Sequence, residues 1–291
     1  VRMGQEYAGS AAMERRLRFI PDLAAAGVNA NYAELIANEG IVSYCAAPLI
    51  SKGQIKGVLE VFHRSALKPD TEWLDFIETL AGQTAIAIEN ATLFNSLQQS
   101  NFDISLAYDA TIEGWARALG LHDPESGEQT PRVTEMTLRL ARALGVRDAD
   151  LVHIRRGALL HDIGKMGIPD SSLLKRSSPD EAESILRQHP RLASDLLSPI
   201  AYLRPAIDIP YCHHEKWDGT GYPRGLKGEQ IPLAARIFSV AEAWSDLRMN
   251  RPSRAGQSFD AASQHLREHS GTWFDPKVVE TLFTILDAES D

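Results

Sequence analysis

The stretches HDIGK, residues 161–165, and HHEKWDGTGYPRGLKGEQIP, residues 213–232, decide the fold expected for this chain. They lie within residues 109–291, where strand-forming runs are weak and helical patterns such as LVHIRRGALL at 151–160 dominate. The Gly- and Pro-rich part of the second stretch, residues 218–232, cannot lie inside a helix and predicts a loop. We therefore expect an all-α domain that carries one prominent loop.

Candidate metal ligands gather around these two stretches. Four of the nine histidines and one aspartate fall close together in the sequence, namely His161, Asp162, His189, His213 and His214. A set of imidazoles with a carboxylate suits Fe or Mn, with Zn as an alternative. Such a centre would lower the pKa of a bridging water enough for attack on phosphorus near neutral pH.

The local sequence predicts how these side chains are presented. The HD pair is expected at the end of an apolar helix, and His189, before Pro190, is expected to close another helix. Neighbouring helical side chains diverge by about 100°, so one of His213 and His214 should face the centre and the other its rim or a second metal. Lys165, almost one helical turn after the HD pair, could neutralise a phosphate oxygen or be a solvated helix-end lysine.

The two stretches together match the pattern HD-x-GK followed by HH-E-x-x-DG-x-GYP-x-GL-x-G-x-x-I, so residues 109–285 resemble the HD-GYP family. The resemblance implies a helical HD-domain fold, two or three divalent metal ions, and hydrolysis of cyclic di-GMP through pGpG towards GMP. It implies metal ligands at His161, Asp162, His189, His213 and His214, and catalytic roles for Lys165 and Asp162. The implied substrate contacts, whose arginines offer forked donors to phosphate, are Lys165, Gly221, Tyr222, Pro223, Arg251 and Arg254.

Four positions near the metal centre depart from or extend the common family pattern. Gln129 stands where the family has a histidine ligand, and an amide oxygen is the poorer ligand, so one site should bind its metal more weakly. Glu242 replaces the last aspartate ligand and reaches one methylene further, a shift that can slow a reaction about a hundredfold. Ser245 replaces another family aspartate. Glu125 matches the extra acid of three-metal members, with a solvated glutamate in a turn as the alternative.

The chain before residue 96 follows a different pattern. Residues 41–64 hold two strand-forming runs around a turn at Lys52-Gly53-Gln54, and a long helical pattern begins at Asp70. This order resembles the later part of a GAF domain, a sensor module, and no ligand is predicted for it. We expect a partial GAF-like α+β domain at 1–95, a connecting signalling helix at 96–115 and an all-α HD-GYP domain at 116–291.

Part of the long helical pattern has the spacing of a coiled-coil seam. Residues recur there at alternating intervals of three and four, namely Ile86, Asn90, Leu93, Leu97, Asn101, Ile104 and Tyr108. An Asn at a seam position can fix the register of two helices. The pattern predicts a parallel homodimer through residues 86–108, and a connecting helix packed on its own domain is the alternative.

The composition limits the remaining classes of protein. The chain is 44% hydrophobic and 24% charged, as in ordinary soluble proteins, and no apolar run approaches the roughly 20 residues of a membrane span. A net charge of −9 disfavours DNA binding. The two cysteines, Cys45 and Cys212, fit a reducing cytoplasm. Because the chain begins at Val1 rather than Met, we expect further sequence upstream.

The sequence thus predicts a metal-dependent cyclic di-GMP phosphodiesterase of reduced activity, regulated by the sensor domain. The alternative is a degenerate module that binds a cyclic dinucleotide, or a GGDEF-type or other signalling partner through the GYP loop. A phosphohydrolase that acts on nucleotides such as dNTPs is disfavoured, because the GYP loop would have no role there.

Overall fold

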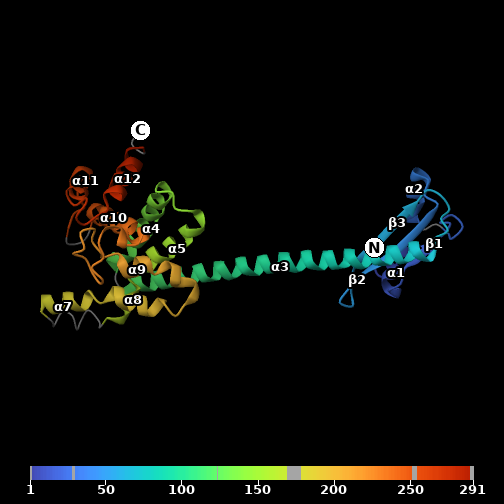
Figure 1. The fold of residues 1–291 in the computed structure, drawn as a ribbon, viewed down its shortest axis with the longest axis horizontal. Helices are drawn as coiled ribbons and strands as arrows, with labels where there is room; N and C mark the ends of the chain where they lie inside the picture. Colours follow the sequence, from blue (N-terminus) through green and yellow to red (C-terminus); the bar gives the residue numbers. More distant parts are fainter. Residues whose placement is uncertain (1, 28–29, 123, 169–177, 251–253, 289–291) are drawn as a thin grey trace. The chain divides into compact units, whose positions relative to one another are not determined.

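The computed structural model describes residues 2–27, 30–122, 124–168, 178–250 and 254–288 (Figure 1). The chain forms two compact units, Val1–Ile104 and Ser105–Asp291. The first combines a small sheet with helices, and the second is helical, as the sequence predicts.

The first unit is built around a three-stranded antiparallel sheet in the order β1-β2-β3, with bounds Arg18–Ile20, Ser43–Ser51 and Gln54–His63. Lys52 and Gly53 form the tight turn between β2 and β3 with φ angles of 49° and 76°, which confirms the predicted hairpin. Helices α1 (Glu6–Glu14) and α2 (Ala30–Glu39) complete this unit together with the first part of α3.

Strand β2 is buried on both faces, which explains its nearly continuous apolar sequence. Because successive side chains point to opposite faces of a strand, Tyr44 and Ala46 pack with Ala11 of α1, while Cys45 and Ala47 pack against α3. The α3 residues in that contact are Ile77, Ala81 and Ala85. The sheet therefore fixes the start of α3.

Helix α3 runs without a break over Thr71–His122, 52 residues, so the helical pattern from Asp70 is confirmed. The Asp70 carboxylate accepts the N–H of Trp73 at 2.8 Å and satisfies one of the free donors at the helix start. The helix supplies residues to both units. Among the described helices, α3 included, none combines the length and the hydropathy that crossing a bilayer requires.

The second unit is all-α in its described residues, apart from isolated bridge residues, among them the pair Ser270 and Phe274. Its helices after α3 are α4 (Pro124–Ala143), α5 (Asp148–Leu159), η1 (Ile163–Gly167), α7 (Pro179–Leu186), α8 (His189–Leu197), η2 (Ala201–Ala206), α9 (Asp208–Cys212), η3 (Gly228–Gln230), α10 (Leu233–Arg248), α11 (Phe259–Glu268) and α12 (Pro276–Asp287).

Two apolar cores hold the segment that carries the HD motif. Ile154 and Ala158 of α5 belong to a large core that they share with α4, α10, α11 and α12. Leu160 and Ile163, on either side of the motif, belong to a smaller core with Ile112 of α3 and with α8. Because both sides of the segment are buried, the backbone at residues 161–162 has little freedom to move.

Three helix ends differ from the expectations. Helix α5 ends at Leu159, so the HD pair lies in the turn before η1 and not within a helix. His189 begins α8 and does not close a helix, because Pro190 occupies the first turn, where its missing N–H leaves no hydrogen bond unmade. Helix α9 ends at Cys212, and the ring centroids of His213 and His214 lie 4.0 Å apart, so the two imidazoles do not diverge as helical neighbours would.

Candidate metal centre

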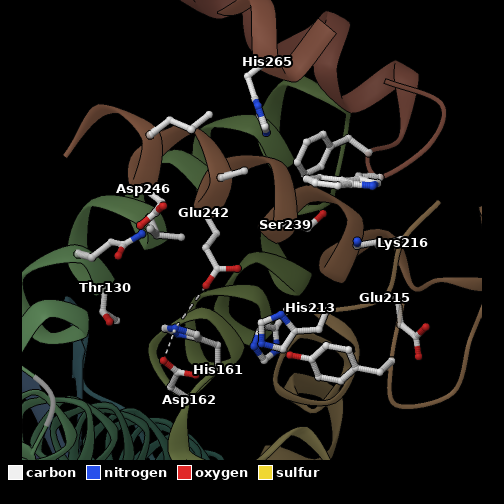
Figure 2. Close-up of a pocket in the computed structure, with 18 of the residues that line it drawn as sticks. Thr130, His161, Asp162, His213, Glu215, Lys216, Ser239, Glu242, Asp246 and His265 are labelled. Carbon is white, nitrogen blue, oxygen red and sulfur yellow. Dashed lines mark ion pairs between the residues drawn. The ribbon is translucent and has the colours of Figure 1, made fainter. Parts of the chain in front are cut away.

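Asp162 lies between the imidazoles of His161 and His189 and, together with His161, lines a cavity in the second unit (Figure 2). One carboxylate oxygen is 3.2 Å from His161 Nε2, and the other is 3.4 Å from His189 Nε2. Lys165 Nζ is 2.7 Å from Asp162 Oδ2, so both charged residues of HDIGK lie at the same point. The predicted pair and the predicted lysine are brought together with His189 from α8.

The glycine of HDIGK permits this approach. A Cβ placed on Gly164 would overlap the carbonyl oxygen of His189, so η1 can touch the start of α8 only with glycine there. The close approach of the two backbones is what places His189 beside Asp162. Gly164, which has no side chain, thereby allows the contact between Asp162 and His189.

The backbone orients three of the histidines in the same way. The Nδ1 atoms of His161, His189 and His213 lie 2.8, 2.7 and 3.0 Å from carbonyl oxygens three or four residues earlier. A carbonyl can only accept, so we assign a hydrogen to each Nδ1, which leaves Nε2 with a free lone pair whenever the imidazole is neutral. Each imidazole therefore presents a ligand atom to the centre.

These lone pairs face one another. His189 Nε2 and His213 Nε2 are 3.3 Å apart, and donor atoms of His189, His213 and His214 all lie within 4.8 Å of one another. Two lone pairs at that distance repel unless a proton or a cation lies between them. Three imidazoles beside a carboxylate are a donor set that suits a divalent transition metal, so the residues fit the metal that the motif implies.

The pKa values favour neutral imidazoles at this cluster. Burial and the neighbouring His214 hold the pKa of His213 well below its usual range, and burial with His189 lowers that of His214 to about 3. Burial also lowers the pKa of His189. Neutral imidazole is the form that binds a metal, so these three side chains need not lose a proton first.

Two further groups have pKa values shifted by their surroundings. Burial acts to lower the pKa of His161, but the charge of Asp162 outweighs it and raises that pKa to about 9. Burial raises the pKa of Glu242 to about 7, although His161 opposes this. Glu242 Oε1 is 3.8 Å from His161 Nε2. A carboxyl group in this environment needs a strong cation nearby to stay fully ionised at neutral pH.

The GYP loop closes one side of the centre. The Tyr222 ring stacks on the imidazole of His214, with centroids 4.7 Å apart, and its peptide bond to Pro223 is cis. A Cβ on Gly221 would overlap the backbone of Glu215, so this glycine permits a close contact. The Glu215 carboxylate accepts backbone N–H groups at residues 224 and 226 at 2.7 and 2.9 Å, which holds the loop.

The cavity above the centre has a volume of about 490 Å³. Gln129 of α4 is buried and lines it together with Glu242. Sequence reasoning missed other lining residues, of which the ones used below are Asp246, Lys216, His265 and Trp273. Only Asp246 had a usable signal, because it follows Glu242 by four residues and so shares its helix face.

The structure describes the side chain of only one of three further predicted site residues, Arg254, Arg251 and Glu125. Arg254 donates to the carbonyl oxygen of Asp246 at 2.6 Å and to its carboxylate at 3.1 Å, beside the cavity. Arg251 lies outside the described residues, and so does the side chain of Glu125, whose backbone belongs to α4. Their roles stay predictions.

Comparison with known families agrees with this architecture. A family model described as HD domain matches residues 115–278, and one described as GAF domain matches residues 1–88. The chain belongs to the HD domain family, within its HD-GYP group, and carries a GAF domain before the HD domain.

Curated relatives match this chain over only part of their own length. A 3'3'-cGAMP-specific phosphodiesterase of Vibrio cholerae is 30% identical over 80% of this chain and 52% of its own length. A cyclic di-GMP phosphodiesterase response regulator of Xanthomonas campestris is 37% identical over 59% of this chain and 46% of its own. A cyclic di-GMP phosphodiesterase of Thermotoga maritima is 37% identical over 56% and 45%. The chain spans about half the length of these relatives.

Proposed function

We propose that this chain hydrolyses cyclic di-GMP at the centre formed by Asp162 and the histidines. The observation that carries the proposal is the convergence of three imidazoles, one carboxylate and one lysine beside a cavity. Several curated relatives are named for cyclic dinucleotide substrates, which supports this substrate class.

Two or three divalent cations, Fe or Mn, would be held by the cluster. The proposed ligands are His161, Asp162, His189, His213, His214 and Glu242, with Gln129 and Glu125 as weaker candidates. When bound, such cations polarise the phosphodiester and supply a nucleophilic water near neutral pH. The raised pKa of Glu242 supports its assignment, because a nearby cation would keep this partly buried carboxylate ionised.

The chain's own residues position the substrate and offset its charge. The Lys165 ammonium, held at 2.7 Å by Asp162, lies where charge grows on the phosphoryl oxygens. Tyr222, stacked on His214, forms the wall that the GYP loop contributes, with Gly221 and Pro223 setting its position. Arg251 and Arg254 are proposed to contact phosphate oxygens through their forked donors. The products are pGpG, GMP or both.

The proposed activity is reduced because of the substitution at Gln129. Its amide is buried in the wall of the cavity that Glu242 also lines, where an imidazole would be the stronger ligand for a transition metal. One metal position is therefore weakened, while the one near His189, His213 and His214 keeps its full set of donors.

We also propose that the GAF domain regulates the HD domain through α3. In the expected division, the sensor occupies 1–95, the connecting helix 96–115 and the HD-GYP domain 116–291. Leu97 is 60% exposed on α3, and Leu93 and Ile104 are exposed as well, which supports a parallel homodimer through this helix. Tyr108 instead stacks on Tyr202 of its own chain at 4.0 Å, so the seam should end before it.

The proposed setting is the cytoplasm, where a GGDEF-type or other signalling partner could reach the GYP loop.

Product chromatography tests the substrate assignment, with cyclic di-GMP, 3'3'-cGAMP and dGTP offered separately to the Mn²⁺- or Fe²⁺-loaded chain under anaerobic conditions. We expect pGpG or GMP from cyclic di-GMP and no hydrolysis of dGTP. Tight binding of cyclic di-GMP without any product would favour the degenerate binding module.

A further inference from the structure

We propose that Lys216 forms a second anion-binding subsite in the same cavity, which holds the phosphate of the cyclic dinucleotide that is not being cleaved. The inference rests on the proposed function and names a substrate contact outside the HD and GYP motifs. Lys216 lines the cavity from its far wall, together with His265 and Trp273.

An aromatic ring fixes the position of the Lys216 ammonium. Its Nζ lies 4.1 Å from the centroid of the Trp273 ring, the distance of a cation–π contact. Backbone hydrogen bonds also join the segment that follows Lys216 to the segment that holds Trp273. Trp217 N–H donates to Trp273 O at 3.1 Å, and Asp218 N–H donates to Thr272 O at 2.8 Å. The lysine is thus held by two segments far apart in sequence, and its remaining N–H groups can point to a ligand.

Among the described residues, Lys216 interacts with a carboxylate through its charge alone, which adds to the hydrogen bonds from Thr220 in lowering the pKa of Asp218. Two lysines line the cavity among the described residues, and Lys165 is bound to Asp162. Within the same described part of the chain, no carboxylate lies at salt-bridge distance from Lys216. The nearby Asp218 carboxylate accepts the N–H and hydroxyl of Thr220 at 2.9 and 2.7 Å. A cation on the cavity wall can bind an anionic ligand, and it offsets part of the negative potential of the acids that line the cavity.

The places of Lys216 and Asp162 in the cavity suit a ligand with two phosphates. Figure 2 shows Lys216 and Asp162 on opposite sides of the His213 imidazole. A cyclic dinucleotide carries its two phosphodiesters on opposite sides of one ring. When one of them lies at Asp162 and Lys165, the other extends along the cavity wall towards Lys216.

The test compares a substrate that has two phosphates with one that has a single phosphate. Lys216→Met, Lys216→Arg and Trp273→Leu are assayed in the full, metal-loaded chain with cyclic di-GMP and with bis(4-nitrophenyl) phosphate. We expect Lys216→Met to raise KM for cyclic di-GMP about tenfold, the effect of losing one charge-assisted hydrogen bond. Its kcat, its metal content and its hydrolysis of the aryl diester should stay unchanged.

Two further variants define the role of the charge. Lys216→Arg should restore KM to near the wild-type value, and Trp273→Leu should raise it because the ammonium loses its support. Lys227→Met is the matched control, since Lys227 is an exposed lysine of the same loop that does not line the cavity. It should leave both substrates unaffected.

Calorimetric binding of cyclic di-GMP keeps this inference separate from the proposed function. Binding that weakens about tenfold in Lys216→Met supports the subsite even if no turnover occurs, and in that case only the hydrolysis proposal fails. An unchanged Kd and KM in Lys216→Met overturns the subsite, as does an equal loss on the two substrates. Absence of any binding to the wild-type chain overturns both.

Discussion

The Nε2 atoms of His189 and His213 lie 3.3 Å apart although each ring directs its Nδ1 to a backbone carbonyl. The folded chain therefore holds two lone pairs against each other, and a divalent cation relieves the repulsion. We expect added Mn²⁺ or Fe²⁺ to stabilise the chain by about 2.7 kcal/mol at a hundred times its Kd. Thermal denaturation with and without a chelator measures the effect.

The variant that tests this relationship is His213→Ala, in which stabilisation by the metal should be lost or greatly reduced. His63→Ala is the control, because that imidazole is exposed in the first unit and should leave the metal response unchanged. Equal stabilisation of both variants by the metal would show that the cation binds elsewhere.

A second prediction concerns the weakened metal position. Gln129→His places an imidazole in the wall of the cavity that Glu242 also lines, at the position that the family resemblance matches to a histidine ligand. We expect bound metal per chain to rise and affinity at the weaker position to increase about tenfold. Metal analysis after gel filtration checks occupancy. Unchanged occupancy and rate would place residue 129 outside the ligand set.

The contact of Gly164 with His189 predicts an unusually large effect for a small substitution. Gly164→Ala forces a methyl group into the carbonyl oxygen of His189, so we expect a loss of about 3 kcal/mol in the free energy of unfolding and weaker metal binding. Gly114→Ala is matched to it, because nothing lies near a Cβ there and helix α3 should gain about 0.5–1 kcal/mol. Urea denaturation distinguishes the two, and similar values for both would contradict the close packing.

Helix α3 is joined to α5 by a largely buried ion pair, Arg156 Nε to Asp109 Oδ1 at 2.8 Å. Asp109→Ala leaves the Arg156 guanidinium buried without its partner and should destabilise the chain by about 3 kcal/mol. Asp150→Ala removes the exposed partner of Arg147 and should change stability by less than about 0.5 kcal/mol. If the two variants lose the same stability, the pair does not anchor α3.

The pH dependence of the metal-free chain follows from His161. Its folded pKa of about 9 exceeds the ordinary 6.5, so the folded chain keeps a proton that the unfolded chain has released. Its stabilising contribution is therefore complete below pH 6.5 and is lost as the pH rises to about 9. Metal binding competes with that proton, so the loss should be much smaller in the metal-loaded chain. Denaturation midpoints of the metal-free and the metal-loaded chain at both pH values check this. An equal loss of stability in the two forms would contradict it.

Periodicity in the sequence was enough to predict the hairpin, the long helix and the all-α second unit. The helix ends were not predictable in the same way, because tertiary packing sets them. Helix α5 stops at Leu159 since Leu160 and Ile163 turn into a second core, which no local pattern reveals. At Pro190 a local rule was available, and it favours a helix start over a helix end.

The metal-binding side of the candidate site could be predicted from two motifs, because adjacent motif residues supply most of the candidate metal ligands. Its far wall could not, since Lys216 gains its role only through contact with Trp273, more than fifty residues later. Pairings between distant segments leave no periodic trace in a single sequence. The i, i+4 relation of Glu242 and Asp246 is the exception that local spacing would have found.

The most direct test of the central claim is metal content measured together with cyclic di-GMP turnover, on the same anaerobically purified sample. The account predicts at least one Fe or Mn per chain, formation of pGpG or GMP, and loss of both metal and turnover in His213→Ala but not in His63→Ala. Less than one metal per chain, with no product after addition of Mn²⁺ or Fe²⁺ under reducing conditions, would contradict it.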